Sequence, residues 1–385
     1  MTLQRFLIRL SHLTTLILLL FLSYRLWSNL RFLRWVRRQA PSLPMQHPRV
    51  SVLVPARNEA TTITPCITSL LKQNYPDIEV IVLNDASTDD TGIQLDALAK
   101  SYPCLKVIHA SDHLPSGWNG KSYACHRLSE QATGEWLLFT DADTEHTAQS
   151  VAQGIAQAIA LDAHMLSAFP FQQTLTWSEQ ISVSFIVDFL PLLGLDLRAL
   201  SSNEGVQAAA NGQYLLVRAS TYRKAGGHAA IYSELLDDFA LARHFRANGY
   251  KIALVDGKEL LQCRMYHNAR ELWQGFSRSL MHGLSGSSTA KRAFWWMPLF
   301  AWGYASLFVN PFYRLLLGEQ RWLSLLEIAW LVTLRGIANW YLKRSLLEVL
   351  TTPFAAWSVM ALEIGAIYRR WQGQTLAWKG RTYVD

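Results

Sequence analysis

Hydrophobic residues divide the chain into an apolar start, an alternating middle and an apolar end. Residues 6–30 hold a dense apolar centre from Leu13 to Leu22, and a membrane-spanning helix needs about 20 apolar residues. Basic side chains flank this centre and can reach lipid headgroups: Arg9, His12 and Arg25. A cleaved signal peptide is the alternative, but no small-residue cleavage pattern follows, so we expect a retained anchor.

Three further apolar stretches near the C-terminus are each long enough to span a membrane: 293–317, 322–342 and 346–368. Aromatic side chains lie near their ends, as at membrane interfaces: Trp295, Trp296, Trp322, Tyr341 and Tyr368. The last two stretches carry charged residues, namely Glu327, Arg335, Glu348 and Glu363. Charges inside a span are costly, so these helices are expected to face one another or a cavity, or to lie in the interface. We expect membrane association here, and the number of spans, two or three, stays open.

The middle of the chain alternates between strand-like and helix-like segments. Short β-branched or apolar runs predict strands within 49–59, 78–87, 105–110 and 135–143. The segments between them predict helices within 60–76, 88–103 and 122–133. This alternation favours an α/β fold with a mostly parallel sheet covered on both faces. The apolar segment 184–197 is either a buried helix or an interfacial one that admits a lipid.

Charge and cysteine usage narrow the class of protein. Lysine and arginine exceed aspartate and glutamate, for a net charge of +7. Arginines crowd just after the first apolar stretch, which indicates a membrane surface and a cytosolic location for the chain from about residue 40 onward: Arg25, Arg31, Arg34, Arg37 and Arg38. This distribution argues against nucleic acid as a partner. The cysteines are scattered without a CxxC pair, so we expect reduced, buried thiols.

Polar residues follow three of the expected strands, at the edge where open α/β sheets bind ligands. They are the runs 55–59, 84–87 and 141–143. Asp141 and Asp143 are two residues apart, and such side chains on an extended segment point the same way. Both can meet one divalent ion, or one can meet the ion and the other its ligand. Mg²⁺ is typically held by one or two carboxylates plus substrate phosphates, so we expect a diphosphate with a divalent ion here.

Some residues at or near this edge allow another interpretation than a site for a diphosphate and a divalent ion. Asp143 is also a good N-cap for a helix expected over 144–160, but that role leaves Asp85 and Asp141 unexplained. The run "GWNGKS" at 117–122 lacks the glycine spacing of a P-loop. Lys121 would lie in the first turn of a helix, where a cation opposes the dipole. An anionic ligand would account for Lys121; the alternative is a solvated surface lysine.

Taken in order, "VSVLVPARNE", "VIVLNDASTDDT", "FTDADT" and "LLDDFALARHF" resemble the inverting family 2 glycosyltransferases with the nucleotide-sugar-binding fold called GT-A. The resemblance covers about residues 48–290. It implies a membrane anchor with a basic linker at 1–40, a GT-A domain at 48–290, and membrane helices with a tail at 291–385.

The resemblance also implies roles for the donor side of the site. Asp85 would contact the base of a nucleotide-diphosphate sugar, and Pro55, Arg57 and Glu59 would line that pocket. Asp141 and Asp143 match the DxD motif of the family, with Asp143 the more direct ligand of Mg²⁺ or Mn²⁺.

Asp238 matches the aspartate of the family's Glu-Asp pair, its catalytic base, although the pair here is Asp237-Asp238. Inverting displacement needs a base that deprotonates the acceptor hydroxyl. Adjacent acids raise each other's pKa, while the metal and Lys121 would stabilise charge on the leaving diphosphate. The alternative role of the pair is to start the helix that Gly249 closes, and the two roles are compatible.

The acceptor side and the subgroup rest on weaker similarities. Residues 209–227 resemble the segment that backs the acceptor site, where Gly212 suits a close backbone approach. Arg278 lies near the position of the QxxRW motif of processive synthases, but the spacing fails and the tryptophan is missing. Arg278 then either touches phosphate or lies at a membrane surface. "GWNGKSYA" and "WKGRTY" are similar to bacterial enzymes that glycosylate carotenoids and to hopanoid-associated relatives.

We therefore expect an integral protein of a bacterial cell membrane whose catalytic domain faces the cytoplasm. It would transfer a sugar to a hydroxyl of a lipid acceptor such as a carotenoid, for example in 2′-O-glycosylation of the myxol type. A polysaccharide or other glycolipid synthase is the alternative, and a non-catalytic membrane scaffold is the third.

Overall fold

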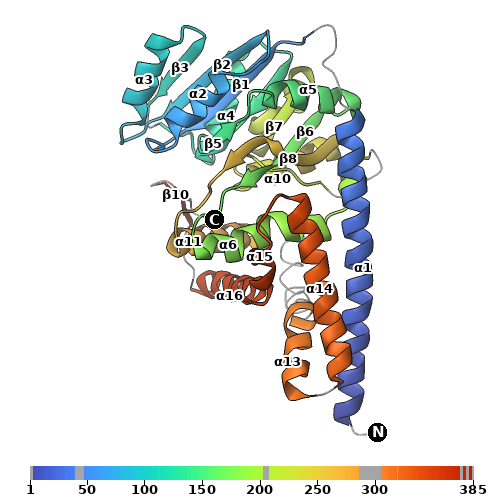
Figure 1. Ribbon diagram of the computed structural model, residues 1–385. Coiled ribbons are helices and arrows are strands. Elements are labelled where there is room, and N and C mark those ends of the chain that lie inside the picture. Colours follow the sequence, from blue (N-terminus) through green and yellow to red (C-terminus); the bar gives the residue numbers. More distant parts are fainter. Residues whose placement is uncertain are drawn as a thin grey trace. The chain divides into compact units, whose positions relative to one another are not determined.

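The computed structural model (Figure 1) describes residues 3–39, 47–111, 113–202, 208–285, 303, 305–318, 320–372, 376–378 and 381–383. Contacts divide the chain into two compact units. The first comprises Met1–Leu30, Thr174–Leu195 and Tyr266–Gln374. The second comprises Arg31–Gln173, Asp196–Met265 and Thr375–Asp385. The segment 174–195 lies within the predicted 48–290 domain but belongs to the first unit.

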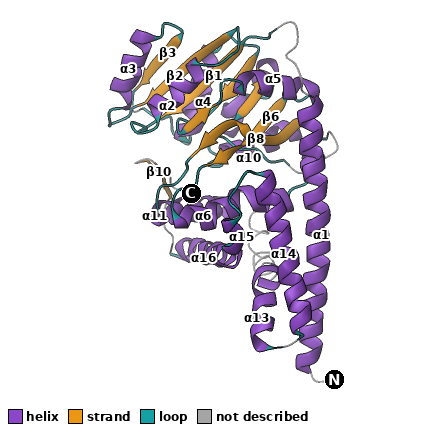
Figure 2. Ribbon diagram, in the orientation of Figure 1, coloured by secondary structure: helices purple, strands orange, loops and turns teal. Residues whose placement is uncertain are grey.

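The second unit is built on an eight-stranded sheet (Figure 2). In spatial order its strands are β3 (Leu105–Ala110), β2 (Ile78–Asp85), β1 (Val50–Ala56), β4 (Trp136–Phe139), β7 (Leu215–Arg218), β6 (Met165–Gln172), β8 (Ile252–Cys263) and β5 (Thr144–His146). The four strands from β3 to β4 run parallel, and β6 is parallel to β8. β7 is antiparallel to both neighbours, and so is β5 to β8. The expected mostly parallel α/β sheet is confirmed.

Helices of the second unit cover this sheet with regularly spaced apolar residues. They are α2 (Ile63–Leu71), α3 (Thr91–Ser101), α4 (Gly120–Gln131), α5 (Ser150–Ala160), α8 (Leu197–Leu200), α9 (Ala219–Lys224), η2 (Gly227–Ile231) and α10 (Asp237–Ala247). One buried cluster joins Leu128 of α4 and Leu241 of α10 to Leu53, Phe139 and Val217 on the strands. Burying such side chains yields about 1.5–3 kcal/mol each. The packing therefore holds α4 and α10 against the sheet.

The helix expected over 144–160 is wrong in its first part. Thr144–His146 forms the strand β5, and α5 begins only at Ser150 after Gln149. Thr144 pairs with Cys263 of β8, and its hydroxyl donates to the Asp141 carbonyl at 2.7 Å. These tertiary bonds satisfy the backbone in an extended form, which a local helical pattern cannot reveal. Asp143 is therefore not a helix cap.

The first unit is helical. It contains most of α1 (Leu3–Gln39), then α6 (Trp177–Val183), η1 (Ser184–Phe189), α7 (Leu190–Gly194), α11 (Ala269–Ser285), η3 (Ala305–Val309), α13 (Asn310–Leu317), α14 (Arg321–Tyr341), α15 (Leu347–Leu350) and α16 (Thr352–Trp371). Phe185 and Phe189 are fully buried, so the buried alternative for 184–197 holds within this unit. The C-terminal tail contains the hairpin of β9 (Leu376–Trp378) and β10 (Arg381–Tyr383).

Within the described residues, one helix is long and apolar enough to cross a membrane. It is Arg5–Arg38, with mean hydropathy 1.9. Its apolar side chains are largely exposed, as Ile17 and Leu20 illustrate at 57 % and 59 %. Neither α14 nor α16 passes the same test of length and composition, and the number of spans among the C-terminal stretches stays open. Of the stretch 293–317, the structure describes residues 303 and 305–317, which include the shorter apolar helix Leu307–Leu317.

Buried charges explain why α14 falls short of a spanning helix. Glu327 is fully buried, accepts from Arg314 and lies 2.8 Å from His12 Nδ1. Arg335 is 1 % exposed and donates to Ser184 Oγ at 2.8 Å. The charges thus face other helices of the unit, as expected. Large apolar side chains remain exposed on the same unit, including Trp322, Trp340 and Trp371.

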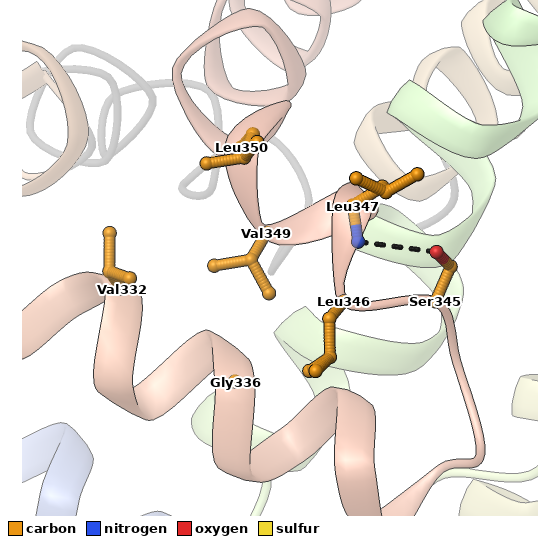
Figure 3. Close-up of a pocket in the computed structure, with 7 residues that line it drawn as sticks. All are labelled: Val332, Gly336, Ser345, Leu346, Leu347, Val349 and Leu350. Carbon is orange, nitrogen blue, oxygen red and sulfur yellow. Dashed lines mark hydrogen bonds between the residues drawn. The ribbon is translucent and has the colours of Figure 1, made fainter.

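An open apolar pocket lies between α14 and α15 (Figure 3). Its lining is Val332, Gly336, Ser345, Leu346, Leu347, Val349 and Leu350. The one polar side chain in it, Ser345, accepts the Leu347 amide at 3.2 Å.

Candidate active site

The carboxyl ends of β1, β2 and β4 meet at one edge of the sheet, because these strands are parallel and in register. Ala56 at the end of β1 is paired with Asn84 of β2. Asp85 ends β2, and Asp141 follows the end of β4 at Phe139 by two residues. The predicted gathering of acidic residues at this edge is therefore seen for Asp85 and Asp141.

The turns after β1 and β2 are tied to each other. Arg57 is 9 % exposed and donates to the Asp85 carbonyl at 2.6 Å. The Glu59 amide donates to Thr91 Oγ1 at 2.8 Å, and the Glu59 carboxylate accepts from Thr62 at 3.1 Å. Pro55 lies in β1 opposite Leu83. Arg57 thus shapes the loop that presents Asp85, a contact that sequence reasoning did not foresee.

Lys121 lies in the first turn of α4, as predicted, and is held by carboxylates. Asn119 caps the helix and accepts the Lys121 amide at 2.9 Å. Lys121 Nζ lies 2.6 Å from Asp141 Oδ1 and 3.8 Å from Asp237 Oδ2. Burial opposes the charge on Lys121, but these two carboxylates outweigh it and raise its pKa well above the usual value. The surface-lysine alternative is therefore wrong.

Asp237 and Asp238 begin α10, in the first turn where carboxylates suit the helix dipole. Asp238 Oδ2 accepts the Gly212 amide at 2.9 Å, and Oδ1 accepts the Phe239 amide at 2.8 Å. Burial first, and then the charge of Asp237, raises the pKa of Asp238 to about 6. Lys121, Asp141, Asp237 and Asp238 together are called the Lys121 cluster below.

Gly212 borders the Lys121 cluster closely. A Cβ at this position would lie 3.1 Å from Lys121 Nζ and 3.5 Å from Asp238 Oδ2. The expected close backbone approach is therefore real, and the absence of a side chain leaves room beside both charges.

The oxygen donors at Asp141 and Asp143 suit Mg²⁺ or Mn²⁺, which prefer carboxylates. Asp141 already contacts Lys121, so an ion there would share its oxygens with an ammonium group. Asp143 has thiol neighbours instead. Burial first, and then the charges of Asp143 and Asp141, raises the pKa of Cys263 well above normal. Burial chiefly raises the pKa of Cys66 to about 12, so both thiols stay neutral and leave Asp143 as the hard donor.

Sequence reasoning missed His228. Its ligand atoms and those of Cys125 and Asp237 all lie within 4.8 Å of one another, and all three residues are buried. His228 follows Gly226 and Gly227, both at positive φ, and this glycine pair was the only local signal. A sulfur, a nitrogen and one carboxylate do not form a site for the hard ions named above.

The remaining predictions have mixed outcomes. All four cysteines are free thiols, as expected, but Cys104 is exposed. Arg37 forms a 2.9 Å ion pair with Asp256, and both residues belong to the second unit, so this arginine also contributes to the packing of that unit. Arg278 belongs to α11 of the first unit, and its side chain lies outside the described residues.

Comparison with known proteins places these motifs in context. The family model for glycosyl transferase family 2 matches residues 51–190. The chain is 26 % identical over 252 residues to a 4,4′-diaponeurosporenoate glycosyltransferase of Staphylococcus aureus strain MRSA252, covering 65 % of each chain. The homologue of strain N315 is also 26 % identical, over 249 residues and 64 % of each chain. The match thus spans less than two thirds of these relatives' length.

Among solved structures, the chain is similar to the mannosyltransferase PcManGT from Pyrobaculum calidifontis, determined with GDP-Man and Mn²⁺. The TM-score is 0.52 at 18 % sequence identity, covering 94 % of this chain and 99 % of that one. This likeness concerns the fold.

Proposed function

We propose that this chain is a family 2 glycosyltransferase with the GT-A fold, and that it transfers one sugar, with inversion, to a hydroxyl of a carotenoid-type membrane lipid. The donor is a nucleotide-diphosphate sugar. The carotenoid class is supported by the names of the S. aureus relatives, and the donor class by the GDP-Man bound in the mannosyltransferase.

The environment of Asp238 is the observation that carries the proposal. Its carboxyl is buried beside Asp237, and its pKa is raised to about 6. A general base works best when its pKa lies near the operating pH. An alcohol must lose its proton to attack, whereas a carboxylic acid is already ionised near neutral pH. The relatives are named for a carotenoate, which is an acid anion, so a poised base here favours an alcohol acceptor.

Every bond and proton in the transfer step is accounted for by the two substrates and Asp238. The acceptor oxygen bonds to the anomeric carbon, the bond from that carbon to the diphosphate breaks, and the acceptor proton passes to Asp238. Lys121 turns toward the negative charge that develops on the leaving diphosphate. A bound Mg²⁺ or Mn²⁺ would supply further charge neutralisation. Asp143 would be its more direct ligand, and Asp141 would hold either the ion or the donor.

The proposal assigns the other predicted residues to the two substrates. Asp85 contacts the base of the donor, and Pro55, Arg57 and Glu59 line that pocket. Gly212 and Asp237 face the acceptor, and the assignment of Arg278 to the acceptor side stays a prediction from the sequence. The spanning helix Arg5–Arg38 supports a membrane location, and the arginines after its apolar centre support a cytoplasmic catalytic domain in a bacterial cell.

The proposal is tested with the full chain in lipid nanodiscs, supplied with UDP-glucose or GDP-mannose and Mn²⁺ or Mg²⁺. One acceptor is a hydroxylated carotenoid, and the other is a carotenoid carboxylic acid of matched length. Release of nucleoside diphosphate and mass spectrometry of the extract report the reaction, and NMR reports the anomeric configuration. We expect a monoglycosylated alcohol product, inverted at the anomeric carbon, and its loss after chelation with EDTA.

Three results would contradict the proposal. Glycosylation of the acid alone would identify the relatives' acceptor class instead. Long polymeric product would favour the polysaccharide synthase. In cells, deletion of the gene should remove a glycosylated carotenoid and accumulate its aglycone, and an unchanged pigment profile would exclude a carotenoid acceptor.

A further inference from the structure

His228 is fully buried beside the Lys121 cluster but is not part of it. Its ring packs edge-on against Phe139, with centroids 4.9 Å apart, and against Tyr222 at 5.7 Å. Burial lowers the pKa of His228 to about 3, so the ring is neutral. A neutral imidazole has one nitrogen that donates and one that accepts, so the role of His228 depends on which nitrogen carries the proton.

Tyr222 contacts both the backbone and the ring of His228. Its hydroxyl oxygen accepts the His228 backbone amide at 3.1 Å and lies 2.8 Å from the ring Nδ1. The proposal below uses the arrangement in which the hydroxyl donates its proton to Nδ1. The proton of the ring is then on Nε2. This nitrogen makes no hydrogen bond within the described part of the chain, and Asp237 Oδ2 lies 4.0 Å from it.

Asp237 has a second, competing neighbour. Lys121 Nζ is 3.8 Å from the same Oδ2 atom, and it is bound more closely to Asp141 at 2.6 Å. The proposed transfer requires Lys121 to turn toward the diphosphate. Asp237 would then remain buried beside Asp238 without a cation, and an unpaired buried carboxylate is costly. A donor must replace Lys121, and His228 Nε2, 4.0 Å from Asp237 Oδ2, is buried beside it.

We propose that His228 is a positioning residue: its Nε2–H donates to Asp237 when Lys121 turns to the diphosphate. The inference rests on the proposed function and deepens it, because it couples occupancy of the donor site to the geometry of the base. Asp237 stays ionised and in place, so that its charge keeps Asp238 basic while the acceptor is deprotonated.

The test compares two variants at this position. His228→Phe keeps an aromatic ring against Phe139 and Tyr222 but removes the N–H. His228→Gln keeps an N–H donor without the ring. His164→Phe is the matched control, because His164 also packs on a tyrosine, Tyr250 at 5.3 Å, at a different place in the same unit. Steady-state kinetics of nucleoside diphosphate release are measured for each, with thermal unfolding alongside.

We expect His228→Phe to lower kcat about 10- to 100-fold, as for a lost hydrogen bond to a charged group. The KM for the sugar nucleotide should change less than about threefold, because the loss falls on the transition state. His228→Gln should recover most of kcat although it packs worse, and His164→Phe should match the wild type. Tyr222→Phe should show a smaller loss of kcat, since it removes the hydroxyl that contacts His228 Nδ1 and so lets the ring proton occupy either nitrogen.

Several outcomes would overturn the inference. His228→Phe with wild-type kcat would remove the role, and His228→Gln as slow as His228→Phe would make the ring, not the donor, responsible. Stoichiometric zinc in the purified protein, lost in both His228→Phe and Cys125→Ser, would make His228 a metal ligand instead. A wild-type protein inactive with every donor overturns the proposed function, whereas an active wild type with unchanged variants overturns this inference alone.

Discussion

Buried charges are arranged differently in the two units of this protein. In the first unit they are matched, as in the pair of Arg314 with Glu327 and the pair of Arg344 with Asp188 at 2.5 Å. In the second unit, the Lys121 cluster has three carboxylates around one ammonium group. Buried charges that are paired neutralise one another. A cluster with more carboxylates than cations needs a positively charged ligand or a carboxyl group with a shifted pKa. The unmatched cluster is therefore the site that we propose, and we expect the matched pairs to act on stability.

Neutralising the proposed base should have the largest effect on activity. Asp238→Asn should lower kcat by about 10²- to 10⁴-fold, the usual contribution of general base catalysis. Sugar nucleotide binding should be nearly unchanged. Asp162→Asn is the control, because that carboxylate is exposed and forms only a 3.7 Å contact with Arg218. Turnover of Asp238→Asn within tenfold of wild type would assign the base to another residue.

The same chemical change in the first unit should act on stability instead. Glu327→Gln leaves the buried Arg314 without its counter-charge, at a cost of about 3–5 kcal/mol. Thermal unfolding in detergent should show a large fall in Tm, while turnover per folded molecule is preserved. Glu130→Gln, at an exposed i,i+4 contact with His126, should be silent. An unchanged Tm for Glu327→Gln would mean that the matched pairs are not structural.

Lys121→Met removes the ammonium group of the Lys121 cluster. The diphosphate loses a stabilising charge in the transition state, so kcat should fall about 10- to 100-fold. The carboxylates left behind repel one another, so Tm should also fall at pH 8 and recover as the pH is lowered. A variant with full turnover would show that Lys121 only balances its neighbours.

A smaller effect concerns the stability of Asp238→Asn relative to wild type. The pKa of Asp238 is raised in the folded protein to about 6, so ionisation opposes folding and protonation favours it. As the pH falls from 8 to 5, the wild type alone gains this stabilisation, roughly 1.4 kcal/mol. In paired unfolding scans, the stability of Asp238→Asn relative to wild type should therefore fall as the pH is lowered over that window. A constant difference across the window would mean that Asp238 is not destabilised by its neighbours.

Much of the site could be predicted because it depends on local pattern and on one rule of topology. Strand runs ending in polar residues placed Asp85 and Asp141 at one sheet edge. Helix-start signals placed Lys121 and Asp237 correctly. The errors concern contacts between residues that lie far apart in the sequence. Residues 144–146 read as helix because nothing local shows that they pair with β8.

The partners of individual side chains were also invisible in the sequence. His228 becomes relevant only when η2 brings it beside Asp237, and the hydrogen bond of Arg57 to the Asp85 backbone also depends on the tertiary fold. The charges on α14 indicated that this helix has partners, but the sequence could not identify them. Hydropathy counts apolar residues and does not show that Glu327 and Arg335 are buried.

The pH dependence of kcat/KM with a hydroxylated carotenoid acceptor tests the central claim most directly. Asp238 accepts a proton only when ionised, so the rate should be maximal above about pH 7 and fall tenfold per pH unit below a pKa of about 6. Asp238→Asn should remove that limb along with most of the activity. A wild-type profile that stays flat from pH 8 to 5 would contradict the account, because no buried carboxylate would then be activating the acceptor.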